Sequence, residues 1–114
     1  MRNMSFALTT PQFLARTKTV TRRIGWSFLK PGDLICGVKK SMGLKKGEKI
    51  ERLGVIRILS IKKERLLHIT QSDVVKEGFP DWTPAQFIQM LVDHYNITGA
   101  KIFNRIEFEY VEGK

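Results

Sequence analysis

The sequence predicts an α+β fold: a small, partly open β-barrel with two or three short helices across its ends. Predicted strands outnumber predicted helices, and the helices are short and interspersed among the strands. One predicted strand, residues 53–61, is apolar on both faces, which suits a closed or covered sheet better than an open one. The 114 residues, 42% of them hydrophobic, suffice for one modest core, so we expect a single domain over residues 1–114.

Two signals describe the N-terminal part of the chain. Residues 4–8 alternate weakly between polar and apolar side chains and favour a short first strand. Thr10 and Pro11 then favour a helix start, because threonine suits the N-cap and proline loses no needed hydrogen bond in the first turn. We expect Phe13 and Leu14, which follow, to face the core.

Residues 17–23 (Thr-Lys-Thr-Val-Thr-Arg-Arg) combine cations with β-branched side chains that suit an extended backbone. If this stretch is extended, Thr21 and Arg23 share one face, whereas Lys18 and Arg22 share the other. A solvated charge run explains the cations but not the three threonines among them. An edge strand without a special role explains the threonines, so that interpretation stays open beside a functional one.

A turn and a long loop follow this stretch. The Lys-Pro-Gly-Asp turn at residues 30–33 predicts a strand over residues 34–39, because proline presets φ and glycine accepts a positive φ. Residues 39–52 hold six cations, two acids and two glycines, and they predict a long exposed loop. Such loops are often functional, so this one either contacts phosphates or is a solvated loop without a partner.

The second half of the chain predicts two capped helices. Thr70 starts a short helix that Gly78 terminates. Residues 83–86 (Thr-Pro-Ala-Gln) give the clearest helix start in the chain, since threonine caps and glutamine completes the capping box. The helix that follows carries one apolar face, expected to be core: Phe87, Ile88, Leu91, Val92 and Tyr95.

Two strands complete the prediction. We expect the strand of residues 53–61 to end at the charged residues 62–65. Alternation over residues 102–111 predicts a half-buried final strand, with Arg105 and Glu107 facing away from the core.

Positive charge is unevenly distributed along the chain. The formal net charge is +9. Residues 1–65 hold sixteen Lys or Arg and four Asp or Glu, whereas residues 66–114 hold four and seven. This asymmetry predicts a basic face for a polyanion beside a more neutral half. A charge that serves solubility alone is the alternative.

The remaining residues argue against several kinds of site. Cys36 is the single cysteine and lies in an apolar run, so we expect a small core residue rather than a nucleophile. His68 and His94 have no cysteine cluster to join, and we expect no metal and no cofactor. No apolar run approaches the roughly 20 residues of a membrane span, and the N-terminus lacks a signal peptide's apolar core. We therefore expect a cytoplasmic protein without membrane contact.

The order of these motifs resembles a known family. The chain has a Lys-x-x-Thr-x-Arg element at Lys18, Thr21 and Arg23, a Pro-Gly-Asp turn, and a capped helix that ends in Glu-Gly-Phe at residues 77–79. This resembles the ASCH domain, a relative of the PUA RNA-binding domains. The ASCH motif is Gly-x-Lys-x-x-Thr-x-Arg, and Arg16 stands where glycine is usual. The resemblance covers nearly the whole chain and implies a PUA-like β-barrel whose cleft holds RNA or a nucleoside.

One bacterial branch of this family is similar enough to imply a reaction. Its members are small amidohydrolases that remove the acetyl group from N4-acetylcytidine. The resemblance implies that their lysine, threonine and glutamate fall on Lys18, Thr21 and Glu77, which would then be the catalytic residues. The long loop of residues 39–52 is a departure from those compact enzymes.

Amide hydrolysis would need an activated nucleophile, a proton carrier and a group that holds the oxyanion. Thr21 would be the nucleophile, and Lys18 would take its proton if burial and neighbouring cations lower the lysine pKa. Glu77 would position the lysine or protonate the leaving amine, and Arg22 or Arg23 would hold the oxyanion. Since Lys18 and Thr21 are an odd number of residues apart, both reach one cleft only if the strand twists or bulges between them. The alternative is a Lys18–Glu77 salt bridge without a catalytic role.

Binding alone demands less of the site. Basic side chains would neutralise phosphates, and a tryptophan would stack on a base unless it is a packing residue. The expected ligand-binding residues are Arg22, Arg23, Trp26, Lys39, Lys40, Lys45, Lys46 and Trp82. We therefore expect a protein that binds RNA or a nucleoside, with deacetylation of N4-acetylcytidine as the sharper alternative. Two other interpretations have less support. The only residues that favour a protein-interaction module are Phe79 and Trp82, and the chain has no histidine pair near the motif that could serve a ribonuclease as acid and base.

Overall fold

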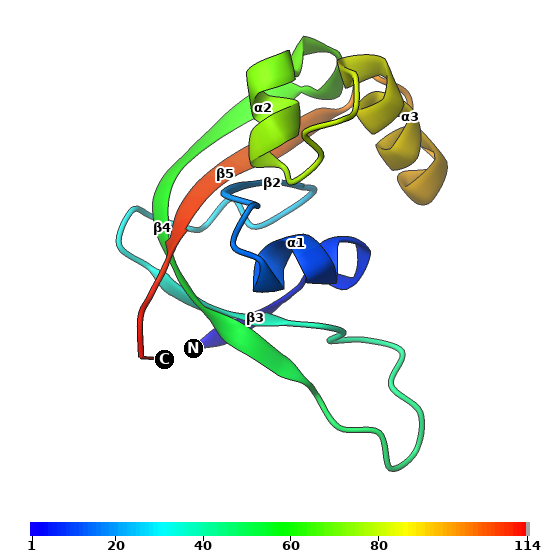
Figure 1. The fold of residues 1–114 in the computed structure, drawn as a ribbon. Helices are drawn as coiled ribbons and strands as arrows, with labels where there is room; N and C mark the ends of the chain where they lie inside the picture. Colours follow the sequence, from blue (N-terminus) through cyan, green and yellow to red (C-terminus); the bar gives the residue numbers. More distant parts are fainter. Residues whose placement is uncertain (114) are drawn as a thin grey trace.

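The chain folds around a single curled sheet of five strands. The structure is a computed structural model that describes residues 1–113. The strands are β1 (Arg2–Ser5), β2 (Val20–Arg23), β3 (Leu34–Val38), β4 (Arg52–Arg65) and β5 (Ile102–Tyr110). They lie in the order β1-β3-β4-β5-β2, with β1 and β3 parallel and the other neighbours antiparallel. The sheet curls into a half-barrel (Figure 1), which confirms the predicted α+β class and partly open barrel.

Three α-helices and two 3-10 turns pack on this sheet. They are η1 (Ala7–Thr9), α1 (Thr10–Leu14), η2 (Leu66–His68), α2 (Gln71–Lys76) and α3 (Pro84–Tyr95). In Figure 1, α1 lies inside the curve of the sheet, and α2 and α3 gather at the end where β4 and β5 run together. The expectation of two or three short helices is confirmed.

The N-terminal elements differ in detail from the prediction. The strand expected at residues 4–8 is β1, which begins and ends earlier, and the chain then turns through η1. The N-cap of α1 is Thr9 and not Thr10. The Thr10 hydroxyl instead donates a hydrogen bond to the Phe6 carbonyl oxygen in the preceding turn. Phe13 is buried as expected, but Leu14 is exposed, because a helix of five residues presents only a narrow face to the sheet.

Strand β4 is longer than the sequence suggested. Residues 62–65, expected to end it, continue the strand and pair with β5 as far as Arg65 opposite Ile102. Their side chains stay largely at the surface while the backbone completes the ladder, so their charge does not oppose the pairing. The register shifts between Ile58 and Ser60, the kind of irregularity that bends and twists a strand.

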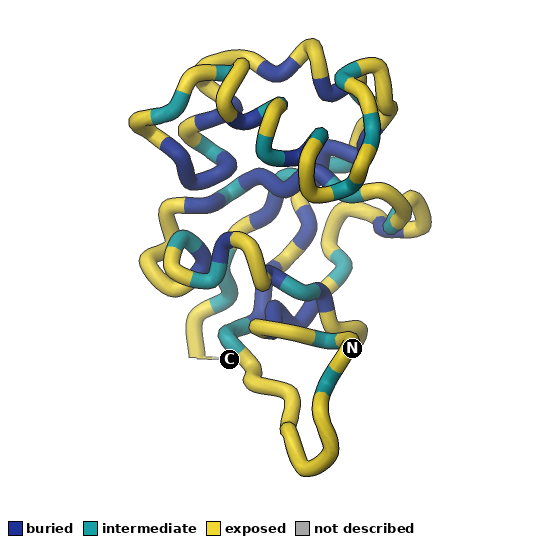
Figure 2. The backbone as a smooth tube through the Cα atoms, turned by 90° about the vertical axis from the view of Figure 1, so that its right-hand side faces the viewer, coloured by how far each residue is buried: buried dark blue, intermediate teal, exposed yellow. Residues whose placement is uncertain are grey.

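The bent sheet carries two separate hydrophobic clusters. The first contains Met4, Phe6, Phe13, Leu29, Ile35, Ile56, Ile58, Ile106 and Phe108. The second involves α2 and α3 and contains Leu66, Ile69, Val74, Phe79, Phe87, Leu91 and Phe103. Figure 2 shows buried segments through the centre of the molecule, whereas the loop of residues 39–51 is largely exposed. The predicted core position of Cys36 is confirmed, since its side chain is buried.

The helix caps follow the local sequence. Thr83 and Gln86 form the full capping box that the sequence predicted at the start of α3. At the start of α2 the Thr70 hydroxyl accepts a hydrogen bond from the Asp73 amide at 3.1 Å. These caps fix where both helices begin, and therefore which of their residues face the sheet.

Arg16 adopts a φ of 60° in the turn between α1 and β2. The ASCH motif usually has glycine at this position, so the chain makes a left-handed turn with a residue that resists it. The Arg16 guanidinium pairs with Glu112 and lies 5.4 Å from the centroid of the Tyr110 ring. Exposed contacts of this kind are worth roughly 0–1 kcal/mol, so they offset only part of the backbone strain.

Arg16→Gly is expected to raise the free energy of unfolding by about 0.5–1 kcal/mol, because glycine removes the left-handed strain at the cost of weak surface contacts. Urea denaturation of both proteins measures the difference. Arg16→Ala is the matched control: it removes the same contacts but keeps the strain, so it should be less stable than the wild type. Equal stability of the two variants would show that backbone conformation is not the cause.

Candidate functional site

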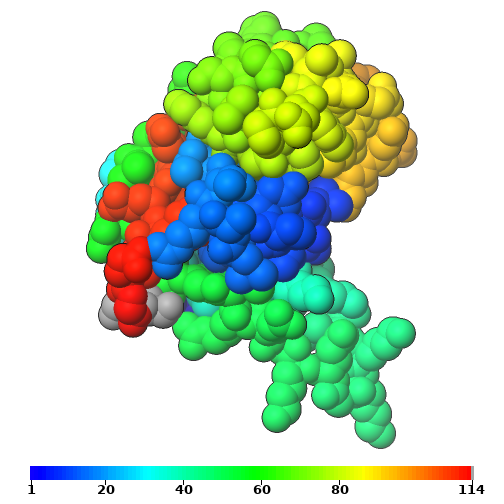
Figure 3. All heavy atoms as spheres, in the orientation of Figure 1, coloured from blue at the N-terminus to red at the C-terminus, as the bar shows by residue number. Residues whose placement is uncertain are grey.

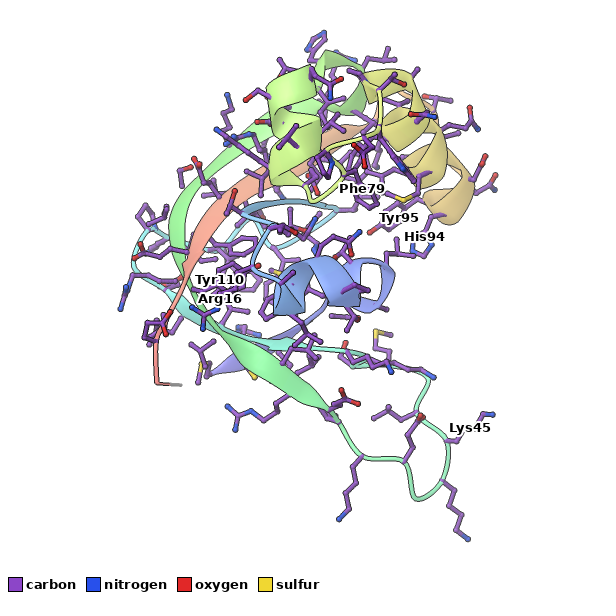
Figure 4. The ribbon with its side chains drawn as sticks, in the orientation of Figure 1. Arg16, Lys45, Phe79, His94, Tyr95 and Tyr110 are labelled. Carbon is purple, nitrogen blue, oxygen red and sulfur yellow. The ribbon has the colours of Figure 1, made fainter. Side chains whose placement is uncertain are left out.

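A cavity of about 230 Å³ lies between the two hydrophobic clusters. η1, the strand β2 and the last turns of α3 line it, and Figure 4 shows His94 and Tyr95 at the end of α3 beside it. The apolar face of α3 is therefore not core alone, because Phe87 and Leu91 also line this cavity. Five predicted site residues come together here: Lys18, Thr21, Arg22, Arg23 and Glu77.

A close backbone approach sets the position of Glu77. The next residue, Gly78, has a φ of 102°, which favours glycine over any other residue. A β-carbon at Gly78 would lie 2.6 Å from the Gln12 side chain, so only glycine permits this contact. The end of α2 therefore lies against α1, and the Glu77 side chain is directed into the protein, where it is 1% exposed.

Hydrogen bonds fix the backbone of Lys18 just before β2. The Tyr110 hydroxyl donates to the Lys18 carbonyl oxygen at 2.6 Å, and the Thr19 amide donates to the Lys76 carbonyl oxygen at 2.7 Å. Burial raises the pKa of Tyr110 to about 12, so this phenol stays a donor over the whole neutral range. The Lys18 side chain can therefore leave the backbone in only a narrow range of directions.

The Glu77 carboxylate joins the two cations of one strand face. Lys18 Nζ donates to Glu77 Oε1 at 2.6 Å and to the Glu77 carbonyl oxygen at 3.1 Å. Arg22 Nη1 donates to Glu77 Oε2 at 2.9 Å, so both carboxylate oxygens are engaged. Burial lowers the pKa of Lys18, the Glu77 carboxylate opposes this effect, and Arg23 and Arg22 reinforce it. The predicted shared face of Lys18 and Arg22 is confirmed.

Three residues that the sequence did not indicate extend this ion network: Glu64, Asp73 and Arg105. Asp73 accepts hydrogen bonds from Arg105 at 2.6 and 3.0 Å and from Arg22 at 2.6 Å. Arg22 also donates to Glu64 at 2.7 Å. Arg105 lies on the face of β5 opposite Ile106 and Phe108, as the alternation predicted, but α2 covers this face and Arg105 is only 9% exposed. Hydrogen bonds from Arg105 and Arg22 hold the pKa of Asp73 well below its usual range.

Thr21 and Arg23 occupy the other face of β2, as the alternation predicted. Arg23 Nε donates to the Thr21 hydroxyl oxygen at 3.0 Å, and the Arg23 guanidinium lies 4.8 Å from the centroid of the Phe6 ring. The pairing of β2 with β5 runs without a register shift over Val20–Arg23, so no bulge lies within the strand itself. Lys18 and Thr21 nevertheless both line the cavity, and Lys18 lies two residues before the strand begins.

The other predicted binding residues lie outside the cavity lining. Trp26 packs on the first hydrophobic cluster with its ring 5.5 Å from that of Phe28, and Trp82 lies 4.5 Å from Phe79 in the second cluster. Figure 3 shows the loop after β3 projecting from the body of the molecule, and Figure 4 places Lys45 on it. The loop carries the predicted lysines Lys39, Lys40, Lys45 and Lys46. Their role as phosphate contacts stays a prediction.

Within residues 1–113, His, Cys, Asp and Glu side chains form no group of three that would suit a metal ion. Over the same residues, none of the helices has the length and apolar character needed to cross a bilayer.

Comparison with known proteins supports the fold. No protein-family model matches the sequence, and no curated protein is similar enough in sequence to match it. The crystal structure of an ASCH domain from Lactobacillus crispatus JV V101 is similar, with a TM-score of 0.67 and 13% identity over 96% of this chain and 78% of the other. A DUF984 protein from Enterococcus faecalis V583 has a TM-score of 0.63 and 14% identity over 96% of this chain and 75% of its own.

The curled sheet and its charged cavity define a small α+β domain. The domain has the ASCH fold, as the resemblance in sequence predicted. At identities of 13% and 14% these similarities establish the fold alone.

Asp73→Asn is expected to lower the free energy of unfolding by about 3 kcal/mol at pH 7, because it leaves two buried arginines without this carboxylate. The folded-state pKa of Asp73 is depressed, so its stabilising effect is complete above the unfolded value of about 4 and is lost as the pH falls through the folded value. Urea denaturation between pH 7 and pH 2 should therefore show a constant gap from the wild type down to about pH 5, which narrows below pH 4.

The control for this series is Asp93→Asn, which removes an exposed carboxylate from α3. Its effect should stay within about 0.5 kcal/mol at every pH. A gap for Asp73→Asn that does not change between pH 7 and pH 2 would contradict the assigned ion pairing.

Proposed function

We propose that the cavity binds a nucleoside, either free or as one unit of an RNA strand. The observation that carries this proposal is the convergence of hydrogen-bonding groups on an aromatic wall. Thr21, Arg23 and Lys18 line the cavity from β2 and the residues before it, and the aromatic residues Phe87 and Tyr95 line it from α3. Bases are recognised in proteins by stacking on aromatic rings together with hydrogen bonds to their edges.

The size of the cavity favours a single unit over a stretch of polymer. Sites for drug-sized ligands enclose roughly 300–1,000 Å³. This cavity encloses about 230 Å³, which suits one base or one nucleoside. An RNA ligand would therefore place one unstacked nucleotide in the cavity, as proteins that read single-stranded RNA do.

The basic loop adjoins the cavity and would serve a polymer. Lys39, Lys40 and Lys49 line a shallow depression, and Ala7 lines both this depression and the cavity. These lysines lie next to the cavity, where they would contact the phosphates that flank a bound nucleotide. An RNA ligand would accordingly bind with an affinity that falls as the salt concentration rises.

Hydrolysis of N4-acetylcytidine is the second candidate, favoured because Lys18, Thr21 and Glu77 line one cavity. Thr21 accepts its hydrogen bond from Arg23, which leaves the hydroxyl proton of Thr21 free for transfer. The Thr21 oxygen would bond to the acetyl carbon while Lys18 takes the proton. The carbon–nitrogen bond would then break, Lys18 would protonate the leaving amine, and water would release acetate from Thr21.

This reaction makes one demand on the site. Lys18 Nζ lies 2.6 Å from Glu77, so the lysine must be uncharged and turn towards Thr21 before it accepts a proton. Burial favours the uncharged lysine, because it lowers the pKa of Lys18. Glu77 would then hold the lysine in reach between the two proton transfers.

Binding is tested with a variant that fills the cavity. Met90→Trp places a large ring in the lining, and we expect it to weaken binding of the four ribonucleosides at least about tenfold in calorimetric titration. Gln89→Trp is the matched control, since it adds the same ring to an exposed position on the same helix and should bind as the wild type does. No binding of any ribonucleoside to the wild type would overturn the proposal for free nucleosides, and titration with a mixed-sequence RNA hexamer would decide the rest.

Hydrolysis is tested by cytidine release from N4-acetylcytidine. Thr21→Val keeps the shape of the side chain but removes the hydroxyl, so turnover should fall at least about a hundredfold while binding of N4-acetylcytidine persists. Thr21→Ser keeps a hydroxyl and should retain measurable turnover. If the wild-type protein shows no turnover even at high concentration, hydrolysis is excluded and the cavity is a binding site only. Equal turnover in Thr21→Val and the wild type would exclude Thr21 as the nucleophile.

A further inference from the structure

The cations that line the cavity are not equally neutralised. Lys18 and Arg22 share the Glu77 carboxylate, and Arg22 also bonds Asp73 and Glu64. Among residues 1–113, Arg23 forms no ion pair with any carboxylate. Because strand alternation puts Arg23 on the face of β2 opposite Arg22, the carboxylates of the ion network lie on the wrong side to pair with it.

The geometry of Arg23 leaves two donor groups open. Its Nε donates to the Thr21 hydroxyl oxygen at 3.0 Å, and its guanidinium plane packs 4.8 Å from the Phe6 ring centroid. These two contacts fix the position and tilt of the guanidinium. Within the part of the chain that the structure describes, its Nη1 and Nη2 atoms donate to no side chain or carbonyl oxygen, although Arg23 lines the cavity.

The surroundings make this open charge costly for the protein alone. Arg23 is partly buried and rests on Phe6, which is 1% exposed. Burial lowers the pKa of Arg23, although a guanidinium remains protonated at neutral pH. A cation that is partly removed from water and not paired is stabilised when a ligand brings a negative charge to it.

We propose that Arg23 binds a phosphate group of the cavity ligand through its two terminal nitrogens, so that the ligand is a nucleotide rather than an uncharged nucleoside. A planar pair of N–H donors matches two phosphate oxygens, which makes arginine well suited to this contact. The inference rests on the proposed function, which places a nucleoside in the same cavity. The phosphate belongs either to a free nucleoside monophosphate or to the backbone of an RNA strand.

Calorimetric titration of the wild type tests the proposal directly. The probes are the four ribonucleosides, their 5′-monophosphates, their 3′-monophosphates, inorganic phosphate and a mixed-sequence RNA hexamer. One series of monophosphates should bind about 10- to 100-fold tighter than the nucleosides, as a charge-assisted contact provides. Preference for monophosphates over the hexamer identifies a free nucleotide as the source of the phosphate, and preference for the hexamer identifies RNA.

Variants assign the effect to one side chain. In Arg23→Gln the advantage of the monophosphate over the nucleoside should fall to less than about threefold, and in Arg23→Lys it should be intermediate, because a lysine keeps the charge but not the paired donors. Arg2→Gln is the matched control. Arg2 also lies over a phenylalanine ring, 4.6 Å from the centroid of Phe28, but it does not line the cavity. Its replacement therefore removes one positive charge and one such ring contact without changing the cavity lining.

The outcomes separate this inference from the proposed function. Nucleosides that bind the wild type as tightly as both series of monophosphates would overturn the inference and leave the proposed function standing, even if Arg23→Gln failed to fold. Inorganic phosphate that binds the wild type but not Arg23→Gln, without any binding of nucleosides, would support the phosphate contact and overturn nucleoside recognition. An unchanged advantage of the monophosphate in Arg23→Gln would overturn the assignment to Arg23.

Discussion

The cavity depends on one buried interaction, the contact of the Glu77 carboxylate with Lys18 and Arg22. Each of these charges would be costly in the protein interior alone, and together with Asp73 and Arg105 they compensate one another through short hydrogen bonds. The network joins the end of α2 to β2 and β5. Charged side chains therefore occupy the region between the two hydrophobic clusters. Apolar residues in their place would have closed this region.

The arrangement also determines which cations are neutralised by carboxylates and which remain available to a ligand. Side-chain alternation in β2 directs Arg22 into the ion network and Arg23 away from it, although the two residues are adjacent in the chain and both line the cavity. Arg22 is held by three carboxylates and stabilises the fold, whereas the contacts that hold Arg23 within residues 1–113 are those with Thr21 and Phe6. A rigid guanidinium with open donors is prepared for a ligand, because little conformational freedom remains to be lost on binding.

Some features of the site could be predicted and others could not. The spacing of Lys18 and Thr21 and the Glu-Gly-Phe end of α2 indicated residues that the fold brings to one cavity. Asp73 gave no signal of its role, because its place three residues after Thr70 is that of a cap amide and says nothing of the arginines that surround its carboxylate. Tryptophans are equally ambiguous, because one side chain suits both packing and stacking. Trp82 packs on Phe79, outside the cavity.

The sequence by itself determined the local structure: the capping box of α3, the left-handed glycine after α2, and the alternation that separates the two faces of β2. These features depend on residues within a few positions of one another. The tertiary structure alone decided which charges are neutralised, since Lys18 meets Glu77 across 59 positions and Arg22 meets Asp73 across 51. Coulomb and desolvation energies depend on distance in space and on burial, and neither quantity is set by separation along the chain.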